Sequence, residues 1–131
     1  MGAILSKGVA QLQVEGTLAT GTNVERWVAP VSGVFTYATA GLKTAATGAS
    51  LQFNVAVNGS TLWSRTIAVN QTTAAEELTP VKFAVGDVVA INVTQVGSTV
   101  AGAGLEVNLA FEGASSDAGP VAYRDFWANV G

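Results

Sequence analysis

The chemistry open to this 131-residue chain is narrow, because it contains neither cysteine nor histidine. The absence of cysteine excludes a disulfide framework, a zinc–thiolate site and a cysteine nucleophile. The absence of histidine removes the commonest general base, the commonest metal ligand and any Ser-His-Asp triad. Catalysis would therefore depend on the nine carboxylates.

The carboxylates are poorly placed for catalysis. A glycosidase needs two of them across a cleft, whereas Glu76 and Glu77 are adjacent and in a strand would point to opposite faces. Asp87 follows a glycine, and we expect its side chain to cap backbone amides in a turn. No Asp-x-Asp-x-Asp run suggests a calcium loop, although a weak site on a trimer axis stays an alternative. We expect no enzyme, no resident metal and no cofactor.

Sugar binding is the remaining chemistry that the residue types allow. Trp63 is followed by Ser64 and Arg65, and an exposed aromatic ring with polar neighbours can hold a glycan. Trp63 and Arg65 are therefore the candidate ligand contacts, with the loop 97–104 as a second location. In the competing interpretation Trp63 packs in the core, because it has the same strand parity as Ile67 and Val69.

The scarcity of charge is the unusual feature of the composition. Only 11% of the residues are charged, against about 25% in an ordinary soluble domain, and 49% are hydrophobic. The six basic residues are scattered, so the chain has no nucleic-acid footprint. No apolar run approaches a membrane span, and residues 1–7 do not resemble a signal peptide. A single domain of this composition would expose apolar surface, which predicts self-association or docking on a larger assembly. The alternative is a monomer whose surface is solvated by Thr, Asn and Gln side chains.

Two stretches, 51–69 and 88–111, show the period-two alternation of half-buried β-strands. Asn58-Gly59 separates two alternating runs in the first stretch, and this dipeptide predicts a tight hairpin. Further strands are expected at 9–14, 24–28, 33–39 and 78–83, the last interrupted by Pro80, with residues 70–75 as a polar link. Phe35 and Tyr37 are expected on one face. About eight strands without helical periodicity predict an all-β sandwich or barrel.

The two terminal segments lack the alternating pattern of the rest of the sequence. Residues 1–8 are expected to form an arm, 9–112 the sandwich, and 113–131 a linker followed by an aromatic tail. Tyr123, Phe126 and Trp127 have the i, i+3, i+4 spacing of one helix face. The tail either folds back on its own sandwich or docks on a neighbour or a capsid surface. The candidate partner-binding residues are those three aromatic side chains, with Ile4 and Leu5 in the arm.

Several segments resemble known jelly rolls. Residues 27–37 resemble the aromatic-x-x-Pro-x-x-Gly strand of the complement-globular-head and tumour-necrosis-factor families, and 86–93 resembles their Gly-Asp-x-Val strand. Residues 42–51 and 93–105 are similar to jelly-roll modules of tailed-bacteriophage virion proteins. Those modules often carry Pro where Ala46 stands and Asp where Gly104 stands.

The resemblance, which covers about residues 24–112, implies an eight-stranded jelly-roll sandwich that is commonly a homotrimer in a virion. We expect a trimeric capsid decoration or cement protein located on the virion, with the major capsid protein or another virion protein as its partner. The chain starts at Met1 without a shaft, which favours decoration over a fibre. The alternatives are a receptor-binding module of a tail fibre or head fibre that holds a host glycan, and a standalone bacterial trimeric binding protein. No nucleic acid or membrane partner is expected.

Overall fold

The computed structural model describes residues 6–113. This part of the chain is all-β, with eight strands and no helix. The strands are β1 (Ser6–Thr17), β2 (Gly21–Val28), β3 (Gly33–Gly41), β4 (Leu51–Val57), β5 (Ser60–Ile67), β6 (Thr73–Phe83), β7 (Val88–Gln95) and β8 (Ala103–Gly113). The expected all-β class is confirmed.

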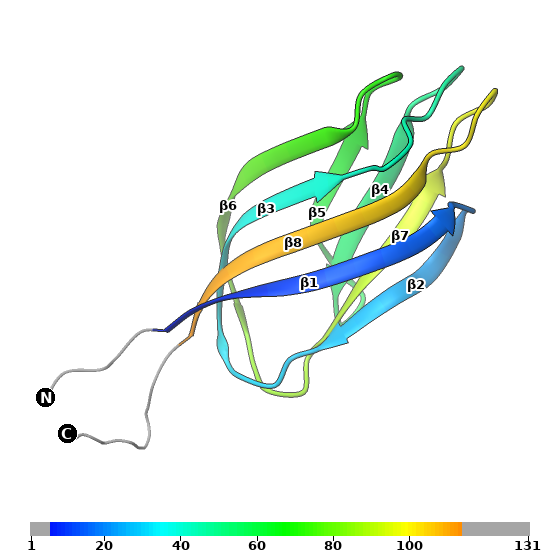
Figure 1. The fold of residues 1–131 in the computed structure, drawn as a ribbon. Coiled ribbons are helices and arrows are strands. Elements are labelled where there is room, and N and C mark those ends of the chain that lie inside the picture. Colours follow the sequence, from blue (N-terminus) through cyan, green and yellow to red (C-terminus); the bar gives the residue numbers. More distant parts are fainter. Residues whose placement is uncertain (1–5, 114–131) are drawn as a thin grey trace, which may run out of the picture.

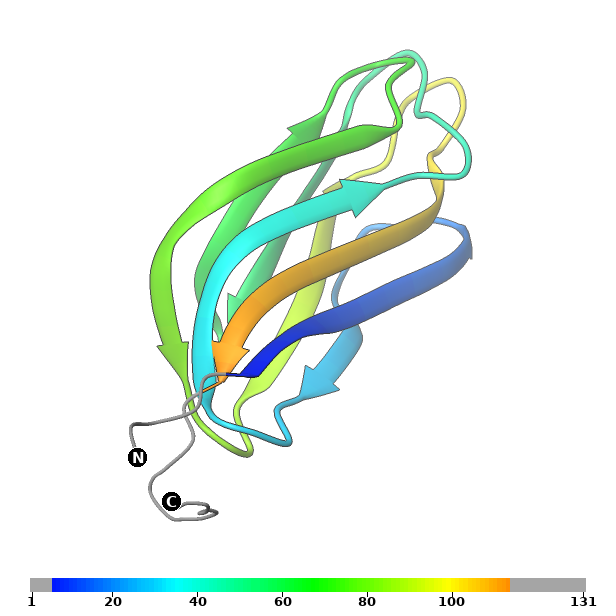
Figure 2. The ribbon, with the colours of Figure 1, turned by 60° about the vertical axis from the view of Figure 1, so that its left-hand side comes forward.

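The strands form two four-stranded antiparallel sheets, ordered β1-β8-β3-β6 and β2-β7-β4-β5, that face each other as a sandwich (Figures 1 and 2). The pairing is nested: β1 pairs with β8, β2 with β7, β3 with β6 and β4 with β5. Such nesting arises when one long antiparallel hairpin curls over so that its two arms contribute alternately to two sheets. This order is consistent with a jelly roll.

The centre of the nested pairing is the turn between β4 and β5. Asn58 and Gly59 have φ values of 50° and 89°, which a two-residue hairpin turn of this type requires at both central positions. Glycine adopts such a φ without a steric penalty. The hairpin that the sequence predicted is therefore confirmed. The pairs β3–β6, β2–β7 and β1–β8 follow outward from it in the nested order.

The core lies between the sheets and is filled by the inward-facing half of each alternating strand. On β4, β7 and β8 the buried side chains include Leu51, Val55, Ile91, Leu105 and Leu109. Four aromatic rings pack together where β2 leads into β3, with Phe35 and Phe83 stacked at 4.2 Å and Trp27 and Phe111 around them. Aromatic pairs at these separations stabilise a core beyond the area that they bury.

One sequence expectation about the core is wrong. Phe35 is fully buried, whereas Tyr37 is exposed on the outer face of the same sheet. The register of β3 against β8 shifts between them, so that Phe35 pairs with Phe111 and Tyr37 pairs with Ala110. The extra residue of this β-bulge, Thr36, reverses the alternation, and the two aromatic side chains do not share a face.

Strand limits also differ from those that the sequence indicated. β6 begins at Thr73, inside the expected polar link, and continues through Pro80, although its register against β3 shifts there. A proline is tolerated because β6 is an edge strand, where one side of the backbone needs no partner. β1 begins at Ser6, inside the segment expected to form an arm, and β8 ends at Gly113.

The two ends of the sandwich are unlike each other (Figure 1). The β3–β4, β5–β6 and β7–β8 loops gather at one end, and the β2–β3 and β6–β7 loops lie at the other. The described chain also starts and stops at this second end, because Ser6 pairs with Gly113 and Gly113 pairs with Gly33. We call it the terminal end. Both terminal segments of the sequence continue from there.

Candidate functional site

Trp63 and Arg65, the candidate ligand contacts, lie together at the edge where the two sheets meet. Both side chains donate to one carboxylate oxygen of Glu76 on β6, Trp63 Nε1 at 3.0 Å and Arg65 at 2.9 Å. The Trp63 side chain is only 4% exposed, and its ring packs edge-on against Phe53. This burial is what the core interpretation of Trp63 predicts, and so little of the ring reaches solvent that no face is open for a sugar to stack on.

The hydrogen bonds from Trp63 and Arg65 change the pKa of the Glu76 carboxyl group. The hydrogen bond from Trp63, followed by the hydrogen bond and charge of Arg65, lowers the pKa of Glu76 below its ordinary value. The carboxylate therefore stays ionised and occupied by its two donors. An acid held in this form is a structural acceptor between the sheets and is unsuited to donate a proton near neutral pH.

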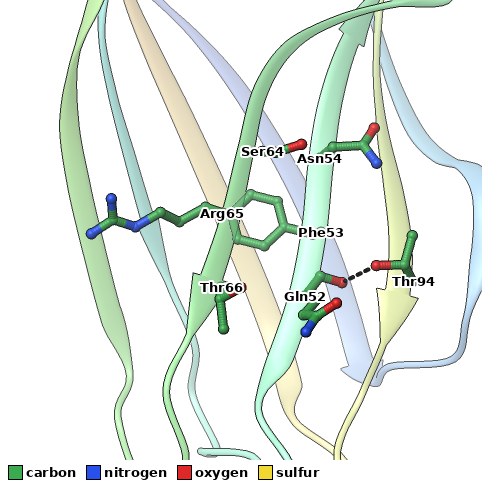
Figure 3. Close-up of a pocket in the computed structure, with 7 residues that line it drawn as sticks. All are labelled: Gln52, Phe53, Asn54, Ser64, Arg65, Thr66 and Thr94. Carbon is green, nitrogen blue, oxygen red and sulfur yellow. Dashed lines mark hydrogen bonds between the residues drawn. The ribbon is translucent and has the colours of Figure 1, made fainter.

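A shallow depression of about 380 Å³ lies on the outer face of the β2-β7-β4-β5 sheet (Figure 3). Its outward-facing side chains are amides and hydroxyls from three strands, Gln52, Asn54, Ser64, Thr66 and Thr94. We call it the amide depression. Arg65 contributes to its lining but extends away from Gln52 and Thr94 in Figure 3, which agrees with its ion pair to Glu76.

Hydrogen bonds order the amides near this depression. Asn92 donates to Asn54 Oδ1 at 2.8 Å and accepts from the backbone amide of Asn23 at 2.8 Å. Thr94 Oγ1 donates to the carbonyl of Gln52. This orders one side of the depression, and its chemistry is that of a neutral polar surface able to exchange hydrogen bonds with hydroxyl groups.

Asp87 has the role that its sequence context predicted. Its carboxylate accepts from the backbone amide of Ala84 at 2.9 Å and from the Asn58 side chain at 3.1 Å, and these bonds lower the pKa of Asp87. Asn58 in turn accepts from the backbone amide of Val88 at 2.9 Å. The carboxylate therefore ties the β6–β7 turn to the β4–β5 hairpin and is a structural group.

Sequence reasoning missed a cluster of exposed valines at the terminal end. Val28, Val31 and Val85 are all exposed, Val85 to 64%. Val28 ends β2. Backbone bonds join the β2–β3 loop, which carries Val31, to the β6–β7 turn, which carries Val85, from Ala29 to Asp87 O at 2.9 Å and from Gly86 to Ala29 O at 2.8 Å. We call these three residues the valine end. The available signal was that each valine lies next to a turn or strand end, where an apolar side chain has no core to enter.

The other candidate partner-binding residues, Ile4, Leu5, Tyr123, Phe126 and Trp127, lie outside the described residues. The segments that carry them join the sandwich at Ser6 and Gly113, which pair with each other at the terminal end. Between residues 6 and 113 no three acidic side chains gather into a group that could hold a metal ion. The same region holds no helix long and apolar enough to span a membrane.

Solved structures match this chain at low sequence identity. No protein-family model matches the sequence, and no curated protein matches it. A GH26-CBM35 β-(1,4)-mannanase of Podospora anserina is 15% identical with a TM-score of 0.40, over 90% of this chain and 27% of that chain. A chain of the T13 IBDV viral particle is 12% identical with a TM-score of 0.33, over 81% of this chain and 31% of that one. This chain thus spans less than a third of either, and neither similarity carries an argument about function.

Proposed function

We propose that this chain is a structural, non-catalytic protein of a bacteriophage virion, a jelly roll that assembles as a homotrimer and decorates the capsid surface. The observation that carries the proposal is the valine end. Three exposed valines lie at the end of the sandwich where both terminal segments join it. Apolar surface gathered in this way is typical of an interface.

The composition supports burial of this surface in an assembly. With 11% charged residues the sandwich has few groups to keep apolar patches hydrated. Each Å² of apolar area removed from water contributes about 25 cal/mol, and this gain must exceed the cost of association. Repeating the contact in three copies multiplies it, which is how a small protein can hold tightly to a shell.

The assignment to a phage rests on the sequence. Residues 42–51 and 93–105 resemble jelly-roll modules of tailed-bacteriophage virion proteins. In the structure these segments are the loops that enter β4 and β8, so both lie at the end opposite the valine end. That arrangement lets the valine end face the shell while the loops face outward.

The proposal is tested by sedimentation of the full chain with undecorated capsids of the phage that encodes it. We expect a trimer that co-sediments with capsids, and we expect Val31→Lys and Val85→Lys to weaken binding. Val100→Lys is the matched control, since Val100 is an exposed valine, 45% exposed, at the opposite end. Equal binding by all three variants would contradict the assignment of the valine end.

The amide depression favours a second candidate function, a receptor-binding module that holds a host glycan. Amides and hydroxyls from three strands converge there, and such groups pair with sugar hydroxyls. A glycan array with the wild-type chain tests this role. Reproducible binding that Asn54→Ala and Thr66→Ala abolish, without capsid binding, would favour the receptor-binding role over decoration.

A further inference from the structure

A second depression, of about 360 Å³, lies on the outer face of the β1-β8-β3-β6 sheet, beside the terminal end. Its lining includes Lys7, Gly8, Val9, Thr36, Ala110 and Glu112, from β1, β8 and β3. We call it the Ala110 hollow. It is independent of the amide depression, which belongs to the other sheet.

The sequence explains why the sheet is hollow at this point. Val9, Ala110 and Tyr37 form one cross-strand row, because Ala110 pairs with Val9 on one side and with Tyr37 on the other. The small side chain therefore lies between two larger ones. The β-bulge at Thr36 bends β3 beside it.

The hollow exposes apolar surface with one charge of each sign at its margin. Val9, which lines the hollow, is 58% exposed, and Tyr37, the cross-strand partner of Ala110, is also exposed. Apolar surface left in water is a cost that an occupant would remove. Lys7 and Glu112 are direct cross-strand partners at the side of the hollow nearest the terminal end. An occupant that fits should therefore carry large apolar side chains and adjacent opposite charges.

The C-terminal tail of the same chain has that composition. Residues 121–127 contain Tyr123, Phe126 and Trp127 around the adjacent pair Arg124-Asp125. The tail follows Gly113, which is the residue after Glu112 in the lining of the hollow. We propose that the aromatic tail docks in the Ala110 hollow of its own chain, with its charged pair facing Lys7 and Glu112.

Chain length favours the chain's own tail over that of a second copy. Nine residues, 114–122, separate β8 from Tyr123, and a flexible linker of that length has an r.m.s. span of about 15–18 Å. A short tether of this kind gives an effective concentration in roughly the millimolar range. In dilute solution the tail of a second copy is present at a much lower concentration than this, so the chain's own tail occupies the hollow. The inference concerns the free protein and does not require the proposed function, although a shell that bound the same aromatic side chains would have to displace them.

Trp127 provides the test, because the emission of Trp127 is the difference between the spectra of the wild-type chain and Trp127→Phe. We expect this difference spectrum to lie at short wavelength and to resist quenching by acrylamide. In the Val9→Lys background it should shift to long wavelength and become readily quenched. In the matched Val100→Lys background, an exposed valine at the far end, it should not change.

The absence of cysteine permits a second measurement that separates the chain's own tail from a neighbour's. The double variant Ala110→Cys/Phe126→Cys should form an intramolecular disulfide under mild oxidation, faster than the control Val100→Cys/Phe126→Cys. A disulfide mainly between chains, or Trp127 protection lost on dilution, would overturn docking within one chain. A Trp127 difference spectrum that is solvent-exposed in the wild type would overturn docking altogether.

Discussion

Trp63 on β5 and Glu76 on β6 are joined by a hydrogen bond of 3.0 Å across the edge where the two sheets meet. β5 and β6 are edge strands of different sheets, so no backbone ladder connects them. The carboxylate oxygen that accepts from Trp63 also accepts from Arg65 at 2.9 Å. The Glu76 carboxylate therefore links the two sheets at an edge where no strand pairing connects them.

Glu76→Ala should lower the free energy of unfolding, because the indole N–H of the buried Trp63 loses its acceptor. Denaturation in urea measures the change. Glu77→Ala is the matched control, since Glu77 is the next residue of the same strand and its side chain points to the other face. The account of this edge is wrong if both substitutions have the same effect.

Acid should destabilise the fold through Glu76 and Asp87. Both carboxyl groups have pKa values lowered by the folded state, Glu76 by Trp63 and Arg65 and Asp87 by Ala84 and Asn58. A lowered folded-state pKa means that the stabilisation is complete above the ordinary values of 4.5 and 3.8 and is lost as pH falls through the folded values. Unfolding free energies measured from pH 7 down to acid should therefore fall, and the double variant Glu76→Gln/Asp87→Asn should show a shallower fall.

Much of the fold could be predicted because alternation and turn chemistry are local. The runs 51–55 and 105–110 alternate in the structure as they do in the sequence, and Asn58-Gly59 forms the predicted hairpin. Asp87 caps its turn because the backbone amide that it accepts from, that of Ala84, lies three residues away. In each case the physical cause lies within a few residues of its effect.

The features that could not be predicted depend on distant partners. The bulge that separates Phe35 from Tyr37 exists only in the register of β3 against β8. Pro80 could remain inside β6 because that strand is an edge, which is a property of the sheet order. Likewise, the acceptor for Trp63 lies 13 residues away on the other sheet. The clustering of the valine end also depends on two loops meeting in space.

Gly59→Ala should destabilise the protein by about 1–2 kcal/mol, the usual cost of placing a non-glycine residue in the left-handed region. Gly59 has a φ of 89°, and a Cβ there would meet nothing within 4 Å, so the loss is purely conformational. Gly41→Ala is the control, because the nearest atom to its Cβ would be at an ordinary 3.8 Å and its φ lies outside that region. Thermal unfolding of both variants checks the prediction, and equal losses would refute it.

Gly8→Ala should destabilise the sandwich by about 1–3 kcal/mol through overpacking. A Cβ on Gly8 would lie 2.5 Å from Cζ of Phe111, whose ring is held by Trp27, Phe35 and Phe83 and has little room to move. The double variant Gly8→Ala/Phe111→Leu should recover part of the loss, because the smaller side chain relieves the contact. Additive losses in a double-mutant cycle would show that the clash is not the cause.

We propose that this sandwich, poor in charge, covers its apolar terminal end only by binding copies of itself and a shell. Analytical ultracentrifugation of the full chain, alone and with undecorated capsids, tests this proposal. We expect a trimer that co-sediments with capsids and loses binding on Val85→Lys but not on Val100→Lys. A single protomer at high concentration that ignores capsids would contradict it.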